Sequence, residues 1–176
     1  MTQKKYAIGV LAVVAAGVAW YLFRPERIFI SKTVNEGFST AASGAGINAS
    51  SQETLATGRF HGVAHNTSGV ATIYSVPGGK RLLRPTDFET SNGPDVQVYL
   101  VAADDASDNA TVTKAGFVHL GALKGNQGDQ NYTLPADLDL GKYRSVTVWC
   151  RRFGVNFGTA PLTMSEMTGT DRKSVV

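Results

Sequence analysis

The stretch Tyr143 to Leu162, YRSVTVWCRRFGVNFGTAPL, holds the only cysteine of the chain and its clearest strand pattern. Side chains alternate between the two faces of a β-strand, so Val146, Val148 and Cys150 share one face. Trp149 falls on the opposite face. The pattern therefore predicts a strand that places the thiol beside core valines.

A second alternating run follows the basic pair Arg151 and Arg152. Apolar side chains stand at positions 153, 155 and 157, with glycine or asparagine between them. Gly154 is typical of a bulge or of a close approach between backbones. The run predicts a second strand, or a continuation of the first strand past a bend.

Short alternating runs recur at intervals of about ten residues through the rest of the domain, with turn residues between them. No helical periodicity accompanies them. The arrangement predicts an all-β fold, an antiparallel β-sandwich or barrel. The expected strands before the Cys150 strand cover residues 59–65, 70–76, 81–88, 96–102, 110–112, 117–123 and 131–134.

The N-terminal segment Tyr6 to Phe23 contains eighteen residues without a charge and follows two lysines. As a helix it would be about 27 Å long, close to the roughly 30 Å hydrocarbon core of a bilayer. We therefore expect residues 1–24 to be a single-pass transmembrane anchor with a cytoplasmic N-terminus and an extracytoplasmic domain. The alternative is a cleaved signal peptide, with Gly17 and Ala19 before the cut, and a secreted or periplasmic domain.

Composition divides the remainder of the chain. Residues 25–57 are rich in Ser, Thr, Ala and Gly and predict a flexible linker, residues 58–162 form the expected domain, and residues 163–176 predict a polar tail.

From Gly58 to Ser165 the chain carries ten Lys or Arg against nine Asp or Glu, so the pI near 9.1 reflects mainly the termini. This balance argues against a nucleic-acid-binding face.

The histidines and acidic residues give no metal-ligand pattern. His61 and His65 share a face in an extended strand but would stand about 13 Å apart, too far to ligate one ion. His119 comes from another part of the chain. The acidic run 104–108 lacks the alternating ligands and central glycine of a calcium loop and is expected at a solvated hairpin tip. We assign no metal ligand.

A single cysteine cannot form an intrachain disulfide, and it excludes both CxxC redox motifs and CxxCH haem attachment. Buried among valines, the Cys150 thiol would behave as a small hydrophobic group. With its sulfur partly exposed, the neighbouring Arg151 and Arg152 would stabilise the thiolate, and Trp149 would lie beside it. We expect a thiol that is shielded on the Val148 side and open to solvent at the arginine end.

A series of short motifs follows in order between Thr57 and Leu162. They are GRF at 58–60, His65, SG at 68–69, DF at 87–88, GPDV at 93–96, VYL at 98–100, LGALKG at 120–125, YTLP at 132–135, WC at 149–150 and FGVNFG at 153–158. Together they resemble the DM-thirteen domain family. The resemblance implies a β-sandwich related to the DOMON domains, and an electron-transfer role. It also implies that Cys150, which matches the family's cysteine, acts as a bare thiol or as a ligand to a prosthetic group.

Three functions follow as hypotheses. The first is a membrane-tethered electron-transfer module that acts through Cys150 on a redox partner protein at the cell surface, without the full site of an enzyme. The second is a non-catalytic surface module that binds a ligand or partner, with the cysteine merely packed. The third is haem binding, which fits the DOMON kinship although the chain has no haem-attachment motif. The residues themselves require no cofactor.

Overall fold

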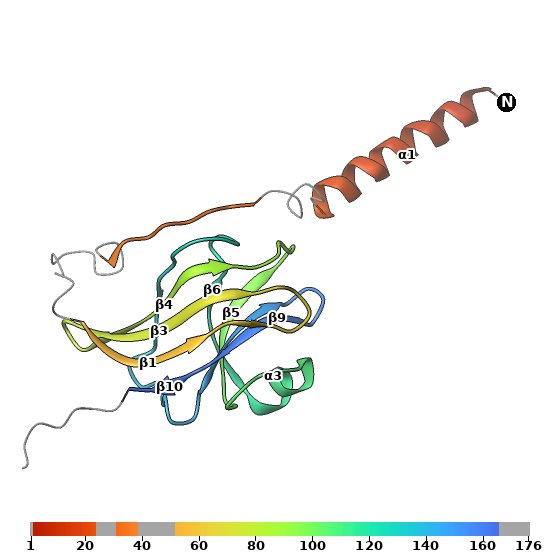
Figure 1. Ribbon diagram of the computed structural model, residues 1–176. Coiled ribbons are helices and arrows are strands. Elements are labelled where there is room, and N and C mark those ends of the chain that lie inside the picture. Colours follow the sequence, from red (N-terminus) through yellow and green to blue (C-terminus); the bar gives the residue numbers. More distant parts are fainter. Residues whose placement is uncertain (1, 24–30, 39–51, 166–176) are drawn as a thin grey trace, which may run out of the picture.

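The computed structural model describes residues 2–23, 31–38 and 52–165 (Figure 1). The first range is helix α1, Thr2–Phe23. Among the described residues, no helix is both long enough and apolar enough to cross a membrane. The membrane anchor at residues 6–23 stays a prediction.

Antiparallel strands build the domain, and they form two five-stranded sheets (Figure 1). The strands are β1 (Glu53–Arg59), β2 (His61–Gly62), β3 (Ser68–Val76), β4 (Lys80–Glu89), β5 (Val96–Val101), β6 (Phe117–Ala122), β7 (Tyr132–Thr133), β8 (Ser145–Cys150), β9 (Val155–Pro161) and β10 (Thr163–Met164). The first sheet has the order β10-β1-β3-β4-β7, and the second has the order β2-β9-β8-β5-β6. The predicted all-β antiparallel sandwich is confirmed.

The chain passes between the sheets several times, and two of these crossings are a single apolar residue each. Phe60 separates β1 of the first sheet from β2 of the second, and Leu162 separates β9 from β10. Both side chains are buried. The ring of Phe60 meets the ring of Phe88 edge-on, with 5.1 Å between their centroids. These crossings tie the two sheets together around one core.

Strand β8 is the central strand of the second sheet, with β5 and β9 beside it. All six of its residues are buried. Its inner face, with Val146 and Val148, packs into the core between the sheets. Its outer face is covered as well, because Trp149 packs with Val112 in a second apolar cluster. Strand β8 is therefore buried on both faces, and Cys150 is its last residue.

Helix α3, Asn109–Ala115, covers this outer face where we expected a strand at residues 110–112. The Asp108 side chain caps the helix by accepting a hydrogen bond from the Thr111 N–H at 2.7 Å. Gly116 ends the helix with a φ of 86°. The predicted strand is wrong because a side-chain cap, a local feature, starts a helix too short to show an apolar periodicity.

Residues 31–38, here called the strap, lie along the loop that precedes β7. The Val34 N–H donates to the carbonyl of Gln127, and the Glu36 N–H donates to the carbonyl of Asp129, both at 2.9 Å. We expected this segment to belong to a flexible linker. Main-chain hydrogen bonds instead hold it on the domain.

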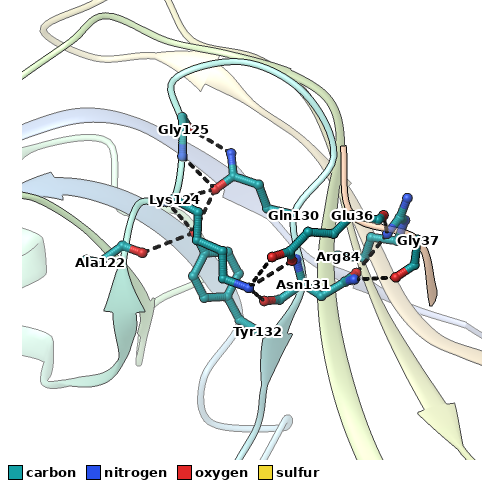
Figure 2. A network of polar contacts seen from close by, with 9 residues as sticks. All are labelled: Glu36, Gly37, Arg84, Ala122, Lys124, Gly125, Gln130, Asn131 and Tyr132. Carbon is teal, nitrogen blue, oxygen red and sulfur yellow. Dashed lines mark hydrogen bonds and ion pairs between the residues drawn. The ribbon is translucent and has the colours of Figure 1, made fainter. Parts of the chain in front are cut away.

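The carboxylate of Glu36 anchors the strap (Figure 2). Its oxygens accept hydrogen bonds from Lys124 Nζ at 2.8 and 2.9 Å, and one of them accepts from the Asn131 N–H at 2.8 Å. Arg84, buried in β4, donates to the Glu36 carbonyl at 2.6 Å. The Asn131 side-chain amide donates to the carbonyl of Gly37 at 2.9 Å. The strap thus satisfies polar groups that the domain itself buries.

The domain also extends past the limits expected from the sequence. Strand β1 begins at Glu53 rather than at Gly58. Strand β10 lies beyond Leu162 and pairs with Ala56 and Thr57 of β1. The remaining parts of the expected linker and tail fall outside the described residues.

Candidate functional site

Cys150 is the last residue of β8, and its side chain lies in the core between the sheets. Its strand neighbours are Val96 on β5 and Val155 on β9. The residue is 0% exposed and belongs to the same apolar cluster as Val146 and Val148. The predicted face of the thiol is confirmed, whereas its predicted opening toward solvent is wrong.

The chain turns away from the core directly after Cys150, and this turn explains why the thiol is not open to solvent. Residues 151–154 form a turn, with Gly154 at a φ of 63°, and β9 is the second strand of the resulting hairpin. The Arg151 N–H donates to the Asp95 carbonyl at 2.9 Å and extends the pairing one residue past the cysteine. Consecutive strand residues project to opposite faces, so the Arg151 guanidinium does not share a face with the sulfur.

The guanidinium of Arg151 pairs with Asp95. Its Nε lies 2.9 Å from the carboxylate Oδ2, and this hydrogen bond, together with the negative charge, raises the pKa of Arg151. Arg152 is exposed in the same turn. A role for the two arginines in tuning the thiol stays a prediction.

Trp149 lies on the opposite side of the sheet from the sulfur. It is buried in the outer cluster with Tyr99, Val101 and Val112. The sheet separates the indole from the thiol, although the two residues are consecutive in the sequence. The immediate strand neighbours of Cys150 are therefore valines and not the polar or aromatic residues predicted to tune it.

Polar side chains that the sequence analysis missed cross the outer face of the second sheet. The Gln97 amide nitrogen donates to the Asp95 carboxylate at 2.6 Å, and His119 Nε2 lies 2.8 Å from the Gln97 oxygen. Because the Gln97 nitrogen is used by the carboxylate, its oxygen must be the acceptor, and His119 Nε2 must be the donor. The bulged pairing of β5 with β6 brings His119 to Gln97, and the positions of these two residues in the sequence do not indicate that contact.

Aromatic rings lie beside this polar chain. The ring of Tyr99 stacks on Phe117 with 4.4 Å between centroids, and His119 meets Tyr99 edge-on at 5.4 Å. Burial raises the pKa of Tyr99. Phe117 is 45% exposed. This face of the sheet therefore presents an exposed aromatic ring near the ion pair of Arg151 and Asp95.

A hollow of about 580 Å³ opens at the start of β5. Val96, the strand neighbour of Cys150, forms part of its wall, together with Leu123 and with Lys32 of the strap. Side chains of directly paired strand residues lie next to each other. The thiol is therefore one side chain away from the hollow.

The histidines have partners outside the core. His61 Nε2 lies 3.1 Å from a carboxylate oxygen of Asp105, His65 packs on a phenylalanine ring, and His119 bonds to Gln97. Within the ranges that the structure describes, no three His, Cys, Asp or Glu side chains are grouped to hold a metal ion. The enclosed sulfur leaves no open side for a bond to iron. These residues do not fit a haem site.

Comparisons with known proteins place the chain in a family. No curated protein and no solved structure matches it. A family model described as electron transfer DM13 matches residues 59–162, which run from the last residue of β1 to the crossing at Leu162 and include Cys150. The resemblance read from the sequence is thus confirmed, and the chain belongs to the DM13 electron-transfer domain family.

Proposed function

We propose that the domain transfers electrons and that its redox-active group is the thiol of Cys150. The family assignment supports electron transfer in general. The position of Cys150, enclosed in the core but only one side chain from a hollow, carries the proposal. An enclosed sulfur is protected from attack by other thiols, which must reach it. An electron does not need such contact.

The proposed step is a one-electron oxidation. The thiol loses one electron to an acceptor protein at the cell surface, which is thereby reduced, and it loses its proton to water that enters from the hollow when the Val96 side chain moves aside. Reduction by a donor protein reverses both transfers. A domain of this kind is a relay between proteins and not a complete enzyme.

Voltammetry of the full chain in a non-ionic detergent tests this role. The wild-type protein should give a redox wave that disappears in both Cys150→Ala and Cys150→Ser. Val148→Ala is the matched control, because it removes buried volume from the same face and keeps the thiol. A wave that survives in Cys150→Ala would refute the proposal.

We further propose that α1 attaches the domain to a membrane, with the domain on the extracytoplasmic side. Residues 6–23 contain no charge. The large apolar side chains described on α1 are all exposed, and they are Tyr6, Ile8, Val10, Leu11, Val13, Val14, Val18, Trp20 and Tyr21. A helix that is apolar on every side favours lipid over water.

Fractionation of cells tests the attachment. The full chain should stay with membranes after alkaline carbonate washing, and external protease should digest the domain in intact cells or spheroplasts. A mature N-terminus at Trp20 would instead support a cleaved signal peptide. Recovery of the intact chain in the soluble fraction would contradict attachment.

A second candidate function is the binding of a protein partner without electron transfer. The exposed ring of Phe117, stacked on Tyr99 near the Arg151–Asp95 pair, favours it, because aromatic and arginine side chains dominate binding surfaces. In a deletion strain, this candidate predicts that Phe117→Ala fails to restore function and Cys150→Ala restores it. Electron transfer through Cys150 predicts that Cys150→Ala fails.

A further inference from the structure

We propose that the hollow at the start of β5 binds a small organic molecule that carries an oxyanion group, either a carboxylate or a phosphate. The volume of about 580 Å³ is typical of small-molecule sites. Its wall comes from three separate parts of the chain, which are the strap, residues 91–97 and residues 122–126. This site does not depend on the redox role of Cys150.

Several polar side chains on the wall are already engaged within the protein. Asp95 accepts hydrogen bonds from Arg151 and Gln97. The ammonium group of Lys124 is neutralised by Glu36 at 2.8 Å. The charges of this set are therefore balanced before any ligand arrives.

Three other side chains on the same wall are not engaged. Lys32, Ser91 and Asn92 also line the hollow, and among the described residues none of the three has a side-chain hydrogen bond or ion pair. An ammonium group, a hydroxyl and an amide can all donate hydrogen bonds. The unused groups thus provide donors and one unbalanced positive charge, which suits an oxyanion.

The wall also contains apolar residues, which favour a ligand with an organic body over a bare inorganic ion. Pro94, Val96, Ala122 and Leu123 line the hollow beside the donors. Burying hydrocarbon against them stabilises a complex in proportion to the apolar surface that is covered. A ligand with an aromatic or aliphatic body should therefore bind more tightly than acetate or inorganic phosphate.

The side chain of Lys32 can be removed without releasing the strap. The Lys32 N–H donates to Asn126 Oδ1 at 2.6 Å, and its carbonyl accepts from the Gln127 N–H at 3.3 Å. Both bonds use main-chain atoms of Lys32, which Lys32→Ala retains. Lys80 provides a matched control, because it is also an exposed lysine but lies in the β3–β4 hairpin, away from the hollow.

Proton–nitrogen NMR of the full chain in a non-ionic detergent tests the site, with benzoate, phenyl phosphate, acetate and inorganic phosphate as probes at constant ionic strength. Benzoate, phenyl phosphate or both should shift the Asn92 side-chain amide and the signals of residues 122–126 in a saturable way. Loss of one charge-assisted contact in Lys32→Ala should weaken that binding about tenfold. Lys80→Ala should bind like the wild type.

The two aromatic probes also distinguish the source of the oxyanion, since the preferred one identifies a carboxylate or a phosphate ligand. Shifts that do not saturate would overturn the proposal. An unchanged affinity in Lys32→Ala would also overturn the proposal, because this substitution removes the ammonium group that should bind the oxyanion. Equal affinity for acetate and benzoate, or for inorganic phosphate and phenyl phosphate, would overturn the proposal that the apolar wall binds the organic part of the ligand.

Discussion

Substitution of Glu36 by alanine should destabilise the domain, although this residue lies in a segment whose composition indicates a linker. The change removes the ion pair with Lys124 and the acceptor of the Asn131 N–H. The side chains of Lys124 and Glu36 are 39% and 25% exposed, so solvent screening limits their pair to about 1 kcal/mol. Asn131 is 5% exposed, and the loss of its charged acceptor should cost about 2 kcal/mol.

The total of about 3 kcal/mol should lower the unfolding midpoint by roughly 12 °C in a domain of this size. Thermal unfolding of the full chain, followed by circular dichroism, gives this midpoint. Glu36→Gln should lose about half as much, since its side-chain oxygen still accepts one hydrogen bond. Glu53→Ala is the control, because Glu53 is exposed on β1 and belongs to no ion pair among the described residues. Equal midpoints for Glu36→Ala and Glu53→Ala would refute the reasoning, because the strap would then not be docked in solution.

Three further changes test other parts of the structure. Cys150→Ser should lower the free energy of unfolding in urea by about 2 kcal/mol, because a hydroxyl enters an apolar site; wild-type stability would mean that the sulfur is hydrated. The hydrogen bond from Thr111 lowers the pKa of Asp108, so the cap should stabilise α3 above the ordinary aspartate pKa of about 4 and be lost as pH falls through the lowered value. Amide exchange in α3 should therefore accelerate in the wild type as the pH falls below the ordinary aspartate pKa, but not in Asp108→Asn, whose amide keeps the cap without titrating. A chain that begins at Ser31 should melt near the full-length midpoint, whereas one that begins at Thr57 lacks the strap and half of β1 and should melt at least roughly 10 °C lower; equal midpoints would contradict this.

The strand that ends at Cys150 could be predicted because alternation is a local property of the sequence. The inner face of Val146, Val148 and Cys150 was predicted correctly. The burial of the opposite face was not predicted, although Ser145 and Thr147 on that face are both 0% exposed. Trp149 on that face packs with Val112 of α3, a short helix that depends on a cap rather than on an apolar pattern.

The strap and the closure of the thiol could not be predicted because both depend on distant partners. Lys32 and Glu36 bond to residues 94 and 95 positions away along the chain. The closure beyond Cys150 depends on Asp95, which binds the next residue through both its carbonyl and its carboxylate. No pattern within one segment reports which loop of the folded domain will lie against it.

The docked strap also limits how far the domain can stand from a membrane that holds α1. Counting residues 24–52 as a free tether between α1 and β1, the chain could span roughly 100 Å when fully extended. With the strap docked, residues 24–30 alone connect α1 to the domain, and they span at most about 29 Å. The strap also supplies Lys32 to the hollow beside Cys150. If α1 is held in a membrane, the same hydrogen bonds that complete the wall of the hollow therefore keep it close to the lipid surface. A redox partner must then reach the domain close to the lipid surface.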